Sequence, residues 1–301
     1  MPAKQMTLPE IFRAFSTDGM SPEPTNQKPQ LKKLKGVRAV LFDVYGTLMQ
    51  SGVGDISLAE EDRGTKREAL IREAIGAAGF MLMDEQSPIA ELFHDTIRAE
   101  QDIRREQGVD FPEVDILGVW EDLIGQLEAY ELIRGRATKS SLRNLSVHYE
   151  ARVNPAAPMP GVTEMIEGLL DKNLPLGIVS NAQFYTPILF EAFLEGAPPD
   201  VGFEDMLCIW SFEHTVGKPS TKLYELAAER LLAYGGIKPE ECLYIGNDIR
   251  NDIMPAAKLG YQTGLFAGDA RSLRLRADDK TCKGVKPDVV ITELEQVLEC
   301  V

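Results

Sequence analysis

Several short stretches of the sequence carry side chains suited to nucleophilic or metal-assisted chemistry. They supply a carboxylate, a hydroxyl, a lysine and two further carboxylates, and each stretch follows an apolar run. A carboxylate becomes a useful nucleophile when cations neutralise its charge, and carboxylate oxygens are preferred ligands of Mg²⁺. The stretches are Asp43-Val44-Tyr45-Gly46-Thr47, Ser180-Asn181, Gly217-Lys218-Pro219, and Gly246-Asn247-Asp248 with Asp252 in the following turn.

The apolar runs beside these residues are short, which is typical of strands buried on both faces. Helical patterns alternate with the runs, and this alternation predicts a doubly wound, Rossmann-like α/β fold with a parallel sheet. Ligands bind at the carboxyl ends of such strands, so we expect the polar side chains to meet on one rim. The predicted strands are 37–42, 174–180, 207–211, 242–246, 261–266 and 288–291, and the helices are 161–172, 220–233 and 292–300.

A long segment after the first predicted strand interrupts this alternation. It has no convincing strand pattern, and three prolines in 154–161 indicate a hinge at its end. We therefore predict an N-terminal extension (1–36), an α/β core (37–49 and 158–301) and an inserted helical cap (50–157). The helices expected in the insertion are 58–78, 87–107, 113–133 and 137–150.

Charge and composition limit the classes of partner. The net charge of −15 argues against nucleic acid and anionic membrane surfaces. We find no apolar run of about 18 residues and no secretion signal, and the four cysteines are scattered without a CxxC pair. These features predict a cytoplasmic protein that acts on a small molecule, and nothing in the sequence indicates its oligomeric state.

The motifs together resemble those of the haloacid dehalogenase superfamily. FDVYGTL (42–48) is similar to its first motif, Ser180 to the second, Lys218 to the third and GNDIRNDI (246–253) to the acidic fourth. The helical insertion lies where that superfamily carries its cap.

The resemblance implies a role for each matching residue. Asp43 would form an aspartyl-enzyme intermediate, Ser180 would bind the transferred group, and Lys218 would hold the charge of the nucleophile. Thr47 and Asn181 are expected to contact the substrate as well. Mg²⁺ would be bound by Asp43, the Tyr45 carbonyl, Asp248 and Asp252, although Asp252 could instead cap the helix that follows.

Position 45 departs from the phosphatase pattern, in which a second Asp protonates the leaving group and then activates water. A phenol with a pKa of about 10 is a poor base near neutral pH. The Asp-x-Tyr-Gly-Thr form instead resembles the 2-haloacid dehalogenases, which expel a halide and need no metal. Asp248 and Asp252 favour a cation, because without one they would crowd Asp43 with like charge.

Three functions therefore remain open. The favoured one is a Mg²⁺-dependent phosphatase of a small phosphorylated metabolite, with a preference for aryl or acyl phosphates, whose leaving groups need no proton. The alternatives are a metal-independent 2-haloacid dehalogenase and a metal-binding pseudo-enzyme with weak turnover.

Other conspicuous side chains have structural interpretations. We expect His94 to make an interhelical hydrogen bond and the neighbouring arginines to form a salt-bridged, solvated face. Arg271 or Arg274 could lie near the rim or on a surface loop, and both tryptophans should belong to the core. The arginines are Arg98, Arg104 and Arg105, and the tryptophans are Trp120 and Trp210.

Overall fold

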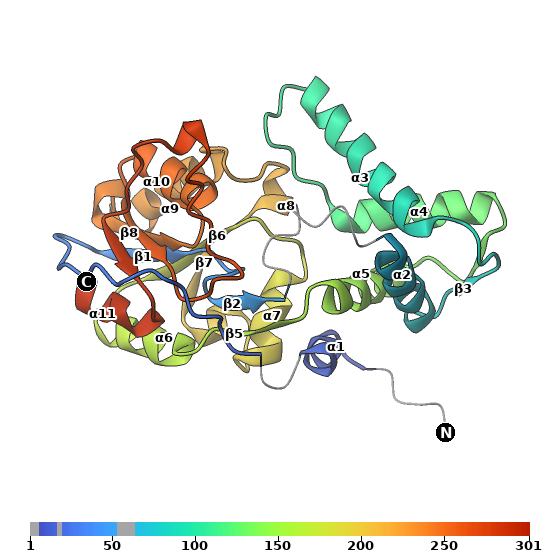
Figure 1. The fold of residues 1–301 in the computed structure, drawn as a ribbon, viewed down its shortest axis with the longest axis horizontal. Coiled ribbons are helices and arrows are strands. Elements are labelled where there is room, and N and C mark those ends of the chain that lie inside the picture. Colours follow the sequence, from blue (N-terminus) through green and yellow to red (C-terminus); the bar gives the residue numbers. More distant parts are fainter. Residues whose placement is uncertain (1–5, 17–19, 53–63) are drawn as a thin grey trace.

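The computed structural model describes residues 6–16, 20–52 and 64–301. Its centre is a six-stranded sheet in the order β10-β9-β8-β1-β6-β7, and every neighbouring pair is parallel (Figure 1). This confirms the predicted doubly wound α/β fold. The strands are β1 (Ala39–Phe42), β6 (Leu176–Ser180), β7 (Phe203–Trp210), β8 (Cys242–Gly246), β9 (Gln262–Phe266) and β10 (Val289–Ile291).

Helices cover both faces of the sheet, so successive residues of the central strand enter different cores. Val40 and Phe42 pack in the core that contains α6 and α7, whereas Ala39 and Leu41 pack in the core that contains α9. Because both faces are buried, the strand is apolar throughout. The helices of the α/β unit are α6 (Val162–Asp171), α7 (Thr186–Phe193), α8 (Ser211–His214), α9 (Lys222–Gly235), α10 (Met254–Lys258) and α11 (Val297–Cys300).

Four helices form a separate group beside the sheet (Figure 1). They correspond to the four helices predicted in the insertion, and residues 58–63 of the first prediction lie outside the described residues. We call this group the cap helices. They are α2 (Gly64–Ala77), α3 (Ile89–Glu106), α4 (Ile116–Ala129) and α5 (Lys139–Val153).

Two small antiparallel sheets correct the prediction for this region. In the insertion, β3 (Met81–Leu82) pairs with β4 (Ile133–Arg134), and two-residue strands are too short to show an alternating pattern. At its base, β2 (Met49–Ser51) pairs with β5 (Ala156–Pro158). Part of the proline-rich segment is therefore an edge strand, a position that tolerates proline, and the hinge stays a prediction.

The described part of the N-terminal segment packs against the rest of the chain. Thr7 and Glu10 form a capping box that begins α1 (Leu8–Phe15), and Ile11 and Phe12 are buried. The sequence analysis did not anticipate this helix. As expected, the proline-rich stretch 21–30 has little regular structure. It is tied to the core by a β-bridge from Gln30 to Val290 and by hydrogen bonds of Glu23 and Thr25.

All four cysteines are unpaired and buried. Among the described residues, we find no helix with the length and apolar character needed to cross a membrane.

Gly177 on β6 tests how tightly the sheet packs against its neighbours. A Cβ added there would lie 2.5 Å from the Leu207 carbonyl oxygen and 2.6 Å from the Leu41 side chain. We expect Gly177→Ala to lower the free energy of unfolding in urea by about 1–3 kcal/mol, because neither neighbour can withdraw without moving the sheet. In the control Gly76→Ala on α2, a Cβ meets nothing within 4 Å. That variant should gain about 0.5–1 kcal/mol, and equal stability of both variants would contradict the packing described.

Candidate active site

The structure brings the predicted nucleophile, hydroxyl and lysine together at the carboxyl end of the sheet. Asp43 follows β1 and is buried. Its Oδ1 accepts a hydrogen bond of 2.9 Å from Ser180 Oγ, at the end of β6, and one of 2.7 Å from Lys218 Nζ. Because β1 and β6 are neighbours in the sheet, Ser180 lies beside Asp43, and Lys218 reaches the same oxygen from the loop between α8 and α9.

Lys218 uses its ammonium group to join three side chains. Besides Asp43, Nζ donates to Asp252 Oδ1 at 2.6 Å and to the Tyr244 hydroxyl oxygen at 2.8 Å. Three donors exhaust the capacity of an ammonium group. The Lys218 side chain is only 2% exposed, so water does not replace these contacts.

Burial and charge shift two pKa values in this cluster. Burial lowers the pKa of Lys218, but the carboxylates of Asp252 and Asp43 outweigh it, so the pKa is raised. Burial raises the pKa of Asp252 to about 6, with Asp43 and Asp248 adding to the rise and Lys218 opposing it. The cluster therefore holds more negative charge than its lysine neutralises.

Two predicted substrate contacts have structural partners instead. Thr47 is fully buried and its Oγ1 donates to Asn247 Oδ1 at 3.4 Å. The side chain of Asn181 accepts from the backbone N–H of Lys218 at 2.7 Å and so ties the end of β6 to the lysine loop. Both side chains therefore hold the site together, and their contact with the substrate stays a prediction.

Gly46 makes the close approach of the loop after Asp43 possible. Its φ is +79°, and a Cβ there would lie 2.5 Å from Asn247 Nδ2 and 2.6 Å from Ser272 Cβ. Only glycine combines this backbone conformation with such a short contact.

Asp248 and Arg276 form an ion pair that the sequence analysis missed. Arg276 Nη2 lies 2.5 Å from Asp248 Oδ2, and Nε lies 3.1 and 3.2 Å from its two oxygens. Asp248 Oδ1 also accepts from the backbone N–H groups of Arg250 and Asn251. The arginine-rich segment 271–276 indicated a cation near the rim. The sequence analysis named Arg271 and Arg274, whereas the residue that pairs with Asp248 is Arg276.

Arg271 and Arg274 lie in other environments. Arg271 pairs with Asp269 at 3.0 Å and donates to Oε1 of Gln50 on β2 at 3.0 Å. The backbone of Arg274 donates to the carbonyl of Asn247, and so supports the loop that carries Asp248.

Tyr45 is half-buried, and its hydroxyl lies 3.1 Å from Thr186 Oγ1. Burial raises the pKa of Tyr45 well above its usual range, and the charges of Glu150 and Asp43 raise it further. The phenol therefore keeps its proton at neutral pH, and it cannot serve as a general base.

Part of the predicted metal site fits a hard cation. Among residues 6–16, 20–52 and 64–301, no group of three or more His, Cys, Asp or Glu side chains is arranged to hold a metal. Asp43 Oδ2 and the Tyr45 carbonyl accept no hydrogen bond within that part of the chain. Mg²⁺ needs only one or two carboxylates besides water, so Asp43 Oδ2 and the Tyr45 carbonyl suit it. Asp248 would join them only if Arg276 released one of its carboxylate oxygens.

Asp252 does not fit the role of a direct ligand. Its Oδ1 accepts from Lys218, and its Oδ2 accepts from the backbone N–H of Asp248 at 2.9 Å. The Tyr244 hydroxyl also lies 3.0 Å from Oδ1. Asp252 is therefore a positioning residue for Lys218 and for the Asp248 loop, which corrects the prediction.

The cap residues largely behave as the sequence predicted. His94 Nε2 lies 3.3 Å from Arg67 Nη1 and so joins α3 to α2. Ion pairs within α3 engage the arginines of its polar face, and both tryptophans are buried. The pairs are Arg98 with Asp95, Arg104 with Glu100, and Arg105 with Asp102.

The site thus joins a parallel α/β sheet to an aspartate that is bound by a serine and a lysine. The family model for haloacid dehalogenase-like hydrolases matches residues 37–260, and the chain belongs to this family. It is thus a hydrolase.

Known proteins similar to this chain include phosphatases and a dehalogenase. The phosphoglycolate phosphatase of Escherichia coli K12 is 28% identical over 239 residues, covering 76% of this chain and 81% of that protein. A hydrolase of Schizosaccharomyces pombe is 30% identical over 88 residues, covering 28% of this chain and 35% of that protein. The structure of a 2-haloacid dehalogenase from Pseudomonas syringae pv. Tomato DC3000 has a TM-score of 0.52 at 18% identity, covering 87% of this chain and 97% of that one. The last likeness shows the fold alone.

Lys218→Met tests the ion cluster. The substitution leaves Asp43 and Asp252 buried without their shared cation. We expect the free energy of unfolding in urea to fall by about 3–5 kcal/mol, as for other broken buried ion pairs. The double variant Lys218→Met/Asp252→Asn should recover part of the loss, because one of the two unpaired charges is gone. A loss below about 1 kcal/mol in the single variant would mean that the pair contributes no more than a surface one.

Proposed function

We propose that the protein is a Mg²⁺-dependent phosphatase of a small phosphorylated metabolite, with Asp43 as the nucleophile. The observation that carries this proposal is the hydrogen bonding of Asp43. Ser180 and Lys218 hold Oδ1, whereas Oδ2 accepts no hydrogen bond from the described residues. One oxygen is thus fixed, and the other is left for attack.

In the proposed reaction, Asp43 Oδ2 attacks the phosphorus atom, and the bond from phosphorus to the leaving-group oxygen breaks. Lys218 stabilises the carboxylate in line with its target, and the Ser180 hydroxyl orients it. Mg²⁺ held by Asp43, the Tyr45 carbonyl and Asp248 would neutralise the phosphoryl charge that otherwise repels the nucleophile. Water then cleaves the aspartyl phosphate and regenerates Asp43.

The nature of Tyr45 limits the substrates of such an enzyme. A leaving group that departs as an unstable alkoxide needs a proton in the transition state. Tyr45 holds its proton tightly, and its hydroxyl faces Thr186. We therefore expect aryl and acyl phosphates, whose leaving groups are stable anions, to be the better substrates.

The relatives named above support the choice of reaction. Phosphoglycolate phosphatases match over most of this chain, which favours phosphoryl transfer. The second candidate is hydrolytic 2-haloacid dehalogenation, and the observation that favours it is Tyr45, since expulsion of halide needs no proton donor.

Phosphate release from phenyl phosphate tests the proposal. The wild type should release phosphate in the presence of Mg²⁺, and excess chelator should abolish the release. Asp43→Asn should lower kcat by at least about 10³-fold, because no other described side chain replaces the nucleophile. Release of chloride from 2-chloropropionate in the presence of chelator, with no phosphate release under any metal condition, would instead establish the dehalogenase.

Tyr45 variants test the missing acid. Tyr45→Phe removes only the hydrogen bond to Thr186, so kcat on phenyl phosphate should stay within about threefold of the wild-type value. Tyr45→Asp should raise hydrolysis of methyl phosphate by about 10²-fold, a usual contribution of a positioned acid. Loss of phenyl phosphate hydrolysis in Tyr45→Phe would show that the phenol takes part in the chemistry.

A further inference from the structure

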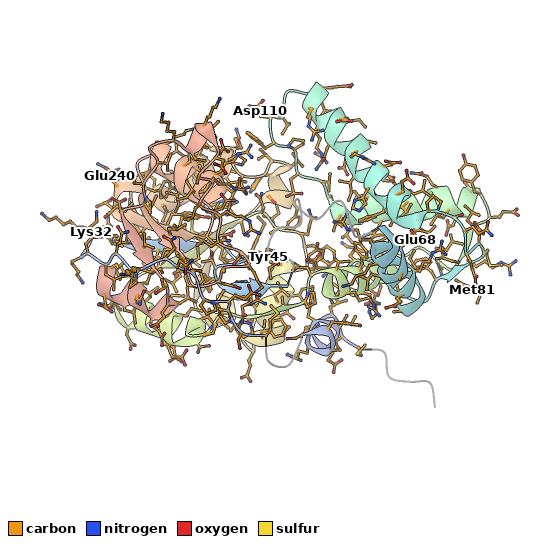
Figure 2. The ribbon with its side chains drawn as sticks, in the orientation of Figure 1. Lys32, Tyr45, Glu68, Met81, Asp110 and Glu240 are labelled. Carbon is orange, nitrogen blue, oxygen red and sulfur yellow. The ribbon has the colours of Figure 1, made fainter. Side chains whose placement is uncertain are left out.

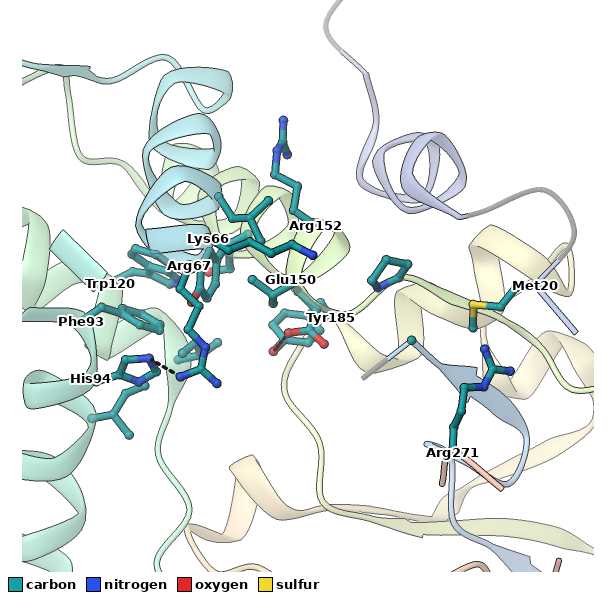
Figure 3. Close-up of a pocket in the computed structure, with 18 of the residues that line it drawn as sticks. Met20, Lys66, Arg67, Phe93, His94, Trp120, Glu150, Arg152, Tyr185 and Arg271 are labelled. Carbon is teal, nitrogen blue, oxygen red and sulfur yellow. Dashed lines mark hydrogen bonds between the residues drawn. The ribbon is translucent and has the colours of Figure 1, made fainter. Parts of the chain in front are cut away.

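A cavity of about 760 Å³ lies between the cap helices and the core (Figure 3). Residues of α2, α3, α4 and α5 line one side, and Met20 and Arg271 line the other. Asp43 is not part of its wall. The cavity is therefore additional to the ion cluster, and the proposed attack by Asp43 does not use its lining.

One wall of the cavity is aromatic. The rings of Phe93 and Trp120 are stacked with centroids 4.3 Å apart, and Tyr149 meets them edge-on at 5.2 and 5.4 Å. Such a cluster also serves as the core of the cap. However, the Trp120 indole N–H is buried and has no hydrogen-bond partner in the described part of the chain. A buried donor without a partner is costly, and a bound acceptor would satisfy it.

The same cavity contains two cationic side chains that form no ion pair within residues 6–16, 20–52 and 64–301. Lys66 and Arg67 line it, and neither has an ion pair with an acidic residue among those described. The other lining arginines, Arg152 and Arg271, pair with Glu73 and Asp269. The chain as a whole carries a net charge of −15, so two lysine or arginine side chains without an ion pair are a local exception. Beside an aromatic wall, they favour the binding of an organic anion.

The cavity ends beside the loop that carries the nucleophile. Glu150 lines it, and its Oε2 accepts from the Tyr185 hydroxyl at 3.0 Å. The next residue, Thr186, touches the Tyr45 hydroxyl at 3.1 Å, two positions after Asp43. Figure 3 shows Glu150 and Tyr185 together between the cap residues and Arg271, and Figure 2 places Tyr45 toward the middle of the molecule.

We propose that this cavity binds the leaving group of the substrate, and that this group is an aromatic ring bearing a second anionic substituent. The inference rests on the proposed phosphatase function. The ring would contact Phe93 and Tyr149, and its substituent would pair with Arg67 and Lys66. When the phosphorus–oxygen bond breaks, the aryl oxygen keeps the electron pair as a phenolate. No proton is then needed from position 45, and the proton of the attacking water passes to solvent in the second step.

Kinetics on two substrates test the cavity. Para-carboxyphenyl phosphate carries the second anion and phenyl phosphate does not. Arg67→Gln should raise KM for the first substrate by about tenfold, the effect of losing one charged contact. It should leave KM for phenyl phosphate and both kcat values within about twofold. Arg98→Gln is the control, because Arg98 is an exposed cap arginine that does not line the cavity. Equal effects of Arg67→Gln on both substrates, or none on either, would overturn the proposal.

A binding measurement separates this inference from the reaction. Calorimetry on Asp43→Asn with para-carboxyphenyl phosphate should show binding about tenfold tighter than with phenyl phosphate, and addition of Arg67→Gln should remove the difference. If the wild type hydrolyses neither substrate but this difference is seen, the phosphatase assignment fails and the cavity remains a binding site. If phenyl phosphate is hydrolysed and the two ligands bind equally, the cavity inference fails alone.

Discussion

The site depends on one buried ammonium group shared between two carboxylates. Lys218 contacts Asp43 at 2.7 Å and Asp252 at 2.6 Å, in a place where water does not reach it. Desolvation of these charges is expensive and is offset only by good geometry. That geometry comes from the sheet order, because β1 lies between β6 and β8 and so gathers Asp43, Ser180 and Tyr244 around one nitrogen.

In the proposed enzyme, the core and the cap have different roles: the core holds the nucleophile and the cap binds the leaving group. The core fixes one oxygen of Asp43 and leaves the other without a donor. It has no carboxylic acid at position 45, where the half-buried Tyr45 places its hydroxyl beside Thr186. In the proposed reaction the leaving group must therefore depart without a proton. The cap would bind it with the aromatic and cationic side chains that line the cavity. A stable anionic leaving group and a cavity suited to one are complementary parts of the same proposal.

The parts of this structure that obey local rules could be predicted from the sequence. Short apolar runs identified all six strands of the sheet. The polar residues that follow them in the sequence led to Asp43, Ser180 and Lys218, which the structure brings together. Contacts between distant segments could not be predicted in this way. The pairing of Asp248 with Arg276, the use of Thr47 to hold Asn247, and the pairing of β2 with β5 all depend on how loops pack, which no local pattern encodes. The cap cavity was missed because its aromatic residues have the helical spacing of an ordinary core.

The most direct test of the account is covalent trapping of the nucleophile. The enzyme is mixed with phenyl phosphate carrying radiolabelled phosphorus and Mg²⁺, quenched in acid during turnover, digested and mapped by mass spectrometry. The account predicts acid-stable, base-labile label on the peptide that contains Asp43, and none in Asp43→Asn. Turnover with no labelled protein, or with label on another residue, would contradict the central role of this carboxylate.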